Sequence, residues 1–151
     1  MGDYISGIEK MEYLTTTAEI YGYDLEFMGV NEPFINFLQK LPVLEEALET
    51  VDDDTIVLCM DAWDTLFNVP KPILIRRFMD MNTGLLMSAE KLYTYQFPQY
   101  KGSYDEINSS YRYVNAGTFM GYAEVIKWMI DECRNLYKDL KVDVDQGLIG
   151  P

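Results

Sequence analysis

The feature that most constrains the fold is a short apolar run, Ile56 to Met60 (IVLCM), which follows the polar turn VDDDT and ends at Asp61. An apolar run of this length, bounded by turn residues, is typical of a buried strand. Strands of a parallel sheet that helices cover on both sides are apolar on both faces. The run therefore favours an α/β domain in which an interior strand carries an aspartate at its carboxyl end.

The segments around this run alternate between helical and strand-like patterns. We expect, in chain order, a helix at Ile8–Tyr21 that stops at Gly22, a strand at Asp24–Val30, a helix at Leu41–Thr50, the strand Ile56–Met60, a helix after Pro72, a strand at Gly84–Ser88, a tyrosine-rich loop at Leu92–Val114, a strand from Gly117 and a helix at Ala123–Leu140. This rhythm predicts one α/β domain over residues 1–151, with a mostly parallel central sheet flanked by helices. Ligands of such sheets bind beyond the carboxyl ends of the strands, which is where Asp61 lies.

Charge and residue counts exclude several classes of function. The chain has 25 acidic and 12 basic residues and a net charge of -13, which repels nucleic acid and anionic membranes and attracts a lysine-rich polypeptide. It contains no histidine, which excludes histidine-based triads and histidine-rich zinc sites. A metal would be held by carboxylates and other oxygens, which favours magnesium, manganese or calcium. We find no membrane-spanning segment and no signal-peptide pattern, and the compartment stays open.

The stretch DAWDTLF, which begins at Asp61, is compatible with more than one role. It is similar to the first motif of the haloacid-dehalogenase superfamily, in which a strand-end aspartate is the nucleophile of a phosphate-transfer hydrolase. Thr65, Leu66 and Phe67 fit that motif, but Asp64 stands where the motif has glycine, and about sixty residues of α/β pattern come first. A third interpretation is that Asp61 only caps the turn after the strand.

The spacing of Asp61 and Asp64 also fits the Asp-x-x-Asp motif of nucleotide-sugar transferases of the GT-A type. Two carboxylates one turn apart can hold a divalent cation, and a cation must offset the charge of the leaving nucleoside diphosphate. Later in the chain, the Asn115–Gly117 turn offers an amide for sugar hydroxyls and a glycine that lets the backbone approach a ligand. Asp145 and Gln146 add an acceptor and a donor at the start of the next element.

The order of five segments makes the interpretation as a nucleotide-sugar transferase specific. DLEFMGV, IVLCMDAWDTLF, MSAEKLY, VNAGTFMGYA and DVDQ follow one another between Tyr13 and Gly147. In this the chain resembles the glycosyltransferase domain of the procollagen-lysine hydroxylases (the PLOD family) and related collagen glycosyltransferases. The resemblance implies a GT-A, Rossmann-like fold and the transfer of glucose or galactose from a UDP-sugar. The implied acceptor is a hydroxyl of hydroxylysine or galactosyl-hydroxylysine in a collagen-like protein.

The resemblance also implies roles at matching positions. Asp61 and Asp64 would hold manganese, with magnesium as the alternative ion, and Trp63 would stack on the uracil ring. The alternative for Trp63 is a purely structural role, in which it packs in the core beneath the turn. Asp145 would be the catalytic position, where it helps to place the acceptor. The remaining residues expected to bind the donor are Asn115, Gly117 and Gln146.

Three departures from the family pattern qualify this expectation. The family's third metal ligand is a histidine downstream of the DQ pair, which this chain lacks. Only MGDYISG is available for the family's first strand, and Val144 interrupts the acidic run before Asp145. We therefore expect a core fragment that is incomplete at both ends. A non-catalytic, glycosyltransferase-like scaffold is the alternative from another class of function.

Overall fold

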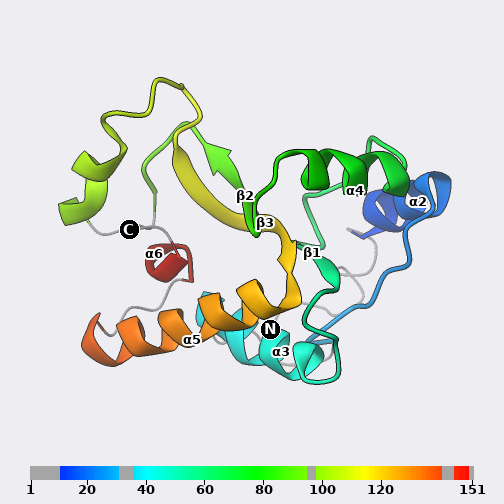
Figure 1. Cartoon of the computed structure of the whole chain (residues 1–151), viewed down its shortest axis with the longest axis horizontal. Helices are drawn as coiled ribbons and strands as arrows, with labels where there is room; N and C mark the ends of the chain where they lie inside the picture. Colours follow the sequence, from blue (N-terminus) through cyan, green and yellow to red (C-terminus); the bar gives the residue numbers. More distant parts are fainter. Residues whose placement is uncertain (1–10, 31–35, 95–97, 141–144, 150–151) are drawn as a thin grey trace.

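The computed structural model describes residues 11–30, 36–94, 98–140 and 145–149, and the fold is given for these residues. Helices and strands alternate along most of the chain (Figure 1). In order they are α2 (Glu12–Tyr21), the 3-10 turn η1 (Phe37–Gln39), α3 (Lys40–Leu48), β1 (Ile56–Met60), α4 (Lys71–Asp80), β2 (Leu85–Glu90), the 3-10 segment η2 (Pro98–Tyr104), β3 (Tyr113–Tyr122), α5 (Ala123–Leu140) and α6 (Asp145–Ile149).

The sheet is antiparallel, which corrects the expectation of a mostly parallel one for the strands described. Its order is β1-β3-β2, so the long strand β3 lies in the middle and runs against both neighbours. Ile56 pairs with Tyr122 at one end of β1, and Met60 pairs with Thr118 at the other. The alternation of helix and strand along the sequence gives no information on strand direction. Here the tyrosine-rich segment between β2 and β3 reverses the chain.

The strand β1 is apolar throughout because helices cover both of its faces. Cys59 belongs to a core cluster that α3, α5 and α6 share with β3. Leu58 and Met60, on the opposite face, pack against a second cluster built from α2 and Phe67. Successive side chains of a strand point to opposite faces, so each face contributes to one cluster. Packing on both faces was expected correctly, although only Cys59 of β1 is fully buried. The expectation of an interior strand with parallel neighbours was wrong for the described sheet, in which β1 is at an edge and its neighbour is antiparallel. In Figure 1, α3 and α5 lie together on one side of the sheet.

Most predicted elements are confirmed, with shifted bounds. α2 stops at Gly22, whose φ of 77° is the left-handed conformation that glycine adopts readily. The first three residues of the predicted helix Ile8–Tyr21 lie outside the described part of the chain. α3, α4, β2 and α5 form where helix or strand was expected, and β3 begins at Tyr113, before the predicted start at Gly117.

The strand predicted at Asp24–Val30 does not form. No strand hydrogen bonding is assigned there, and side chains hold the segment in place instead. The Tyr23 ring stacks on Phe67 at 3.7 Å between centroids, and its hydroxyl donates to the Val69 carbonyl. Asp24 pairs with Lys71 at 3.1 Å. These contacts hold only the start of the segment, and its later apolar residues Phe27, Met28 and Val30 are exposed.

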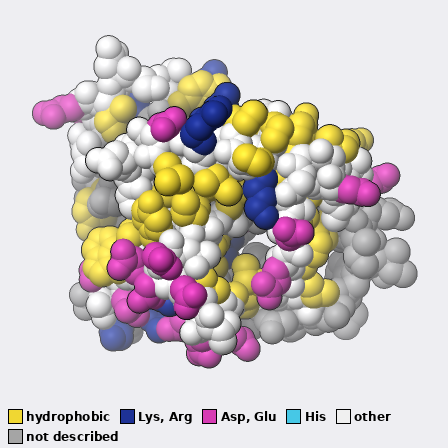
Figure 2. All heavy atoms as spheres, turned by 45° about the vertical axis from the view of Figure 1, so that its right-hand side comes forward, with side chains coloured by type: hydrophobic (Ala, Val, Ile, Leu, Met, Phe, Trp, Pro, Cys, Tyr) yellow, Lys and Arg dark blue, Asp and Glu magenta, His cyan; other side chains and the backbone are white. Residues whose placement is uncertain are grey.

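The tyrosine-rich segment packs on itself. The rings of Tyr93, Tyr104 and Tyr113 meet edge to face, and Tyr104 is buried. Aromatic packing therefore holds this part of the expected tyrosine-rich loop in place. The surface carries the charge expected from the sequence, with a group of acidic side chains visible low on one face (Figure 2). None of the described helices has the length and apolar character needed to cross a membrane.

Candidate donor-binding site

The candidate site is centred on an irregularity in the sheet. Met87 of β2 pairs with Phe119 of β3, but the next residue, Ser88, pairs with Asn115. Ala116, Gly117 and Thr118 of β3 therefore lie opposite a break in the ladder. This bulge sits beside the end of β1, where Met60 pairs with Thr118. Bulges free backbone groups from the ladder and change the direction of nearby side chains, and they are common beside functional sites.

Two residues predicted for the site, Asp61 and Asn115, contact a third, Gly117. The Asp61 N–H donates to the Gly117 carbonyl at 2.7 Å, so Asp61 continues the pairing of β1 with β3. The Gly117 N–H donates to Asn115 Oδ1 at 2.9 Å. The Ser88 hydroxyl donates to the same oxygen, at 3.1 Å, and lies 2.9 Å from the Asn115 carbonyl. The amide oxygen of Asn115 is thus held inside the bulge by two donors.

Glycine is required at position 117 by the space around it. A Cβ built there would lie 2.9 Å from Asn115 Oδ1 and 3.0 Å from Asp61 Oδ2. The absence of a side chain thus leaves room for the second carboxylate oxygen of Asp61. From the sequence, this glycine was expected to let the backbone approach a ligand closely. Its observed effect is to let Asp61 and Asn115 lie against the bulge.

The other carboxylate oxygen of Asp61 is paired with a lysine that the sequence analysis missed. Lys40, the first residue of α3, places Nζ 2.7 Å from Asp61 Oδ1 and donates to the Ala116 carbonyl at 3.1 Å. Both side chains are partly exposed, at 33% for Lys40 and 44% for Asp61. The sequence does hold a signal for this residue. Lys40 is the only basic residue between Met11 and Pro70, a stretch that contains 13 acidic residues.

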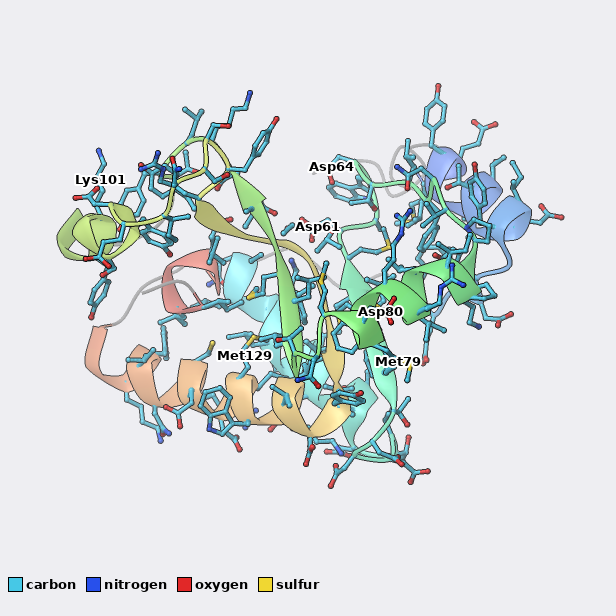
Figure 3. The ribbon with its side chains drawn as sticks, turned by 45° about the horizontal axis from the view of Figure 1, so that its top comes forward. Asp61, Asp64, Met79, Asp80, Lys101 and Met129 are labelled. Carbon is cyan, nitrogen blue, oxygen red and sulfur yellow. The ribbon has the colours of Figure 1, made fainter. Side chains whose placement is uncertain are left out.

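The turn after β1 presents Trp63 and Asp64 to solvent. Trp63 is 59% exposed and Asp64 is exposed, while Phe67 is the aromatic residue that buries itself under the turn. This exposure argues against the structural role of Trp63 as a core residue. Thr65 fixes the turn because its hydroxyl donates to the Asp61 carbonyl. Figure 3 shows the two labelled aspartates beyond the end of β1, Asp61 beside β3 and Asp64 farther out.

Gln146 lies behind the bulge and is 7% exposed. Its Oε1 accepts the Ala116 N–H at 3.3 Å, and its Nε2 donates to Glu90 Oε1 at 2.6 Å and to the Thr94 carbonyl at 2.9 Å. Gln146 therefore connects α6 to β3 and to the segment that follows β2. Its role at the sugar stays a prediction. So does that of Asp145, which begins α6 and whose side chain lies outside the described part.

Two carboxylates, those of Asp61 and Asp64, follow the end of β1. Carboxylate oxygens are ligands that hard divalent cations prefer. Within the described ranges, no three acidic or cysteine side chains gather into a cluster that could enclose a metal ion. Magnesium-type sites often use only one or two carboxylates and take their remaining ligands from water and substrate phosphates. If a cation were held by these two carboxylates, most of its remaining ligands would have to come from water or from a bound substrate.

Comparison with known proteins identifies the family of the chain. A family model described as the PLOD GT domain matches residues 6–145. Chicken procollagen-lysine,2-oxoglutarate 5-dioxygenase 1 is 25% identical over 126 residues, which are 77% of this chain and 17% of the relative. Human multifunctional procollagen lysine hydroxylase and glycosyltransferase LH3 is 25% identical over 135 residues, 82% of this chain and 18% of the relative. Uncharacterized protein R699 of Acanthamoeba polyphaga mimivirus is 32% identical over 94 residues, 61% of this chain and 20% of the relative.

This chain spans about a fifth of the length of these relatives. The family match nevertheless covers most of the chain, and it contains β1, the bulge of β3 and the turn with Trp63. The matched range also spans the motifs quoted from the sequence as far as Asp145. The chain belongs to the PLOD GT domain family.

Proposed function

We propose that this chain binds a UDP-hexose and transfers its glucose or galactose to an acceptor hydroxyl. Membership of the family supports glycosyl transfer, and one of the relatives is named as a glycosyltransferase. The observation that carries the proposal is the convergence of Asp61, Asn115 and Gly117 at the bulge, beside the exposed pair Trp63 and Asp64. The same family match removes the main reason to prefer a phosphate-transfer hydrolase.

Each residue of the site has a distinct part in this proposal. Asp61 and Asp64 hold manganese or magnesium, which offsets the negative charge on the departing UDP when it is bound. Trp63 is 59% exposed beside this site, and its indole is proposed to stack on the uracil ring. Asn115 contributes through its Nδ2 group. Its Oδ1 already accepts from the Gly117 N–H and the Ser88 hydroxyl, so the Nδ2 group is the donor that a sugar hydroxyl would meet.

The acceptor is proposed to be a hydroxylysine, or its galactosyl derivative, in a collagen-like polypeptide. The net charge of -13 favours the approach of a lysine-rich chain. Asp145, at the start of α6, is proposed to place the acceptor hydroxyl, and Gln146 holds α6 against β3 at that point.

The test is a transfer assay with manganese, UDP-glucose or UDP-galactose, and peptides that contain hydroxylysine or galactosyl-hydroxylysine. A gain of one hexose on the peptide, measured by mass spectrometry and absent with Asp61→Asn, is the expected result. UDP binding without any transfer would instead identify a binding scaffold. Release of phosphate from a phosphomonoester that depends on Asp61 would contradict the proposal and favour the hydrolase.

A further inference from the structure

We propose that Lys40 is the counter-ion of Asp61 when no donor is bound, and that a divalent cation binds this chain tightly only together with the nucleotide diphosphate. The inference rests on the proposed function, because it assigns how the ligands of that site affect each other's binding. It gives a role to a residue that the sequence motifs do not include.

The geometry gives Lys40 two partners at the site. Its ammonium lies 2.7 Å from Asp61 Oδ1 and 3.1 Å from the Ala116 carbonyl, so it joins the end of β1 to the bulge of β3. Lys40 begins α3, where the positive end of the helix dipole disfavours a cation. The position of this lysine is therefore explained by Asp61 rather than by the stability of the helix.

A metal ion and the Lys40 ammonium compete for the same carboxylate. Both are cations, and they repel each other when both contact one oxygen of Asp61. Without nucleotide, a metal ion would have to displace Lys40 and would find no cluster of three acidic or cysteine ligands among the described residues.

The diphosphate removes both obstacles. Its oxygens supply the cation with additional ligands, as substrate phosphates do at magnesium sites. They also give the Lys40 ammonium a new anionic partner, so the lysine can release Asp61 without losing an ion pair. Nucleotide and cation should therefore raise each other's affinity, and the coupling must be reciprocal.

The chain offers a closely matched control in Lys127. Its Nζ lies 2.7 Å from Asp53 Oδ1 and 2.9 Å from the Val51 carbonyl, and its side chain is 33% exposed, as is that of Lys40. Asp53 precedes β1, whereas Asp61 follows it. Lys127→Met thus removes an equivalent ion pair from the other end of the strand.

The experiment measures manganese binding by electron paramagnetic resonance of the free ion, with and without UDP. Four proteins are compared: wild type, Lys40→Met, Lys40→Arg and Lys127→Met. We expect weak binding to wild type without UDP and at least about tenfold tighter binding with it, which is within the usual range of coupling between two ligands. Lys40→Met should bind manganese without UDP about tenfold more tightly than wild type and gain less from UDP. Lys40→Arg and Lys127→Met should behave as wild type.

The outcomes separate this inference from the proposed function. If UDP strengthens manganese binding in wild type but Lys40→Met binds the lone ion no better than wild type, the role of Lys40 is wrong and the donor site stands. If wild type shows no UDP-dependent binding of manganese, both fail. Urea unfolding of each variant establishes that the proteins compared are folded.

Discussion

Replacing Gly117 by alanine should damage the site more than the fold. The added Cβ would lie 2.9 Å from Asn115 Oδ1 and 3.0 Å from Asp61 Oδ2, closer than ordinary contacts. Asn115 cannot turn away easily, since its oxygen accepts from the Gly117 N–H and from Ser88. The carboxylate of Asp61 is only partly buried and is the group that can move, at the expense of its position beside the bulge.

The magnitude follows from two opposing effects. Forcing extra atoms into a filled space costs about 1–3 kcal/mol. Replacing glycine by alanine recovers about 0.5–1 kcal/mol, because the unfolded chain has fewer conformations to lose. The net loss for Gly117→Ala should be about 1 kcal/mol, which lowers the melting temperature by about 2–4 °C in a domain of this size. Displacing a group that orients a metal ligand lowers metal affinity by about 10–100-fold, so UDP affinity in the presence of manganese should fall by about 10-fold or more.

Two other glycines provide the controls. A Cβ at Gly121 would lie 2.8 Å from the Gly84 carbonyl, where backbone must move, so Gly121→Ala should destabilise the sheet more than Gly117→Ala. A Cβ at Gly102 would have only Asp105 Oδ2 within reach, at 4.0 Å, so Gly102→Ala should change neither property. Urea unfolding and calorimetric titration of UDP with manganese measure the two quantities. Unchanged UDP affinity in folded Gly117→Ala would refute the assignment of Asp61 and the bulge to the donor site.

Three further predictions follow from single contacts. Trp63→Ala should weaken UDP binding by about 1–3 kcal/mol through loss of base stacking. Trp128→Ala, which removes a similarly exposed tryptophan (61%) from α5, should leave UDP binding unchanged. Equal UDP affinities of the two variants in calorimetric titration would contradict stacking by Trp63. Gln146→Ala should lower stability by about 2 kcal/mol, because Glu90 and the Ala116 N–H lose a buried partner; an unchanged urea midpoint would contradict this. Burial raises the pKa of Cys59 from 9.0 to about 12, despite the opposing charge of Lys40. The unfolded thiol therefore ionises first, and the contribution of Cys59 to stability is present below about pH 9 and is lost as the pH rises toward 12. Wild type should lose stability over this range relative to Cys59→Ala, and parallel pH profiles would contradict it.

The parts of the fold that depend on local sequence pattern could be predicted from the sequence. The strand β1, the glycine that ends α2 and the helix α5 each appear in the structure near their predicted positions. Asp61, Asn115 and Gly117 do meet, although Asp61 follows β1 and the other two lie on β3. The order of the motifs could indicate that these residues are close, because β1 ends beside the bulge of β3.

The remainder depends on pairing that local pattern does not encode. Strand direction is set by long-range contacts, and an apolar strand covered on both faces has the same composition whether its neighbours are parallel or antiparallel. Asp24–Val30 has the composition of a strand but no partner strand among the described residues. Lys40 lies 21 positions before Asp61, outside any motif, and only the fold of α3 onto the bulge brings the two together.

The measurement that tests the central claim most directly is a calorimetric titration of UDP into the protein, with and without manganese, repeated with Asp61→Asn. The account predicts binding that requires both the ion and the carboxylate of Asp61, with unchanged urea unfolding of the variant. Binding of equal strength in all conditions, or none in any of them, would contradict the assignment of this site to a nucleotide-sugar donor.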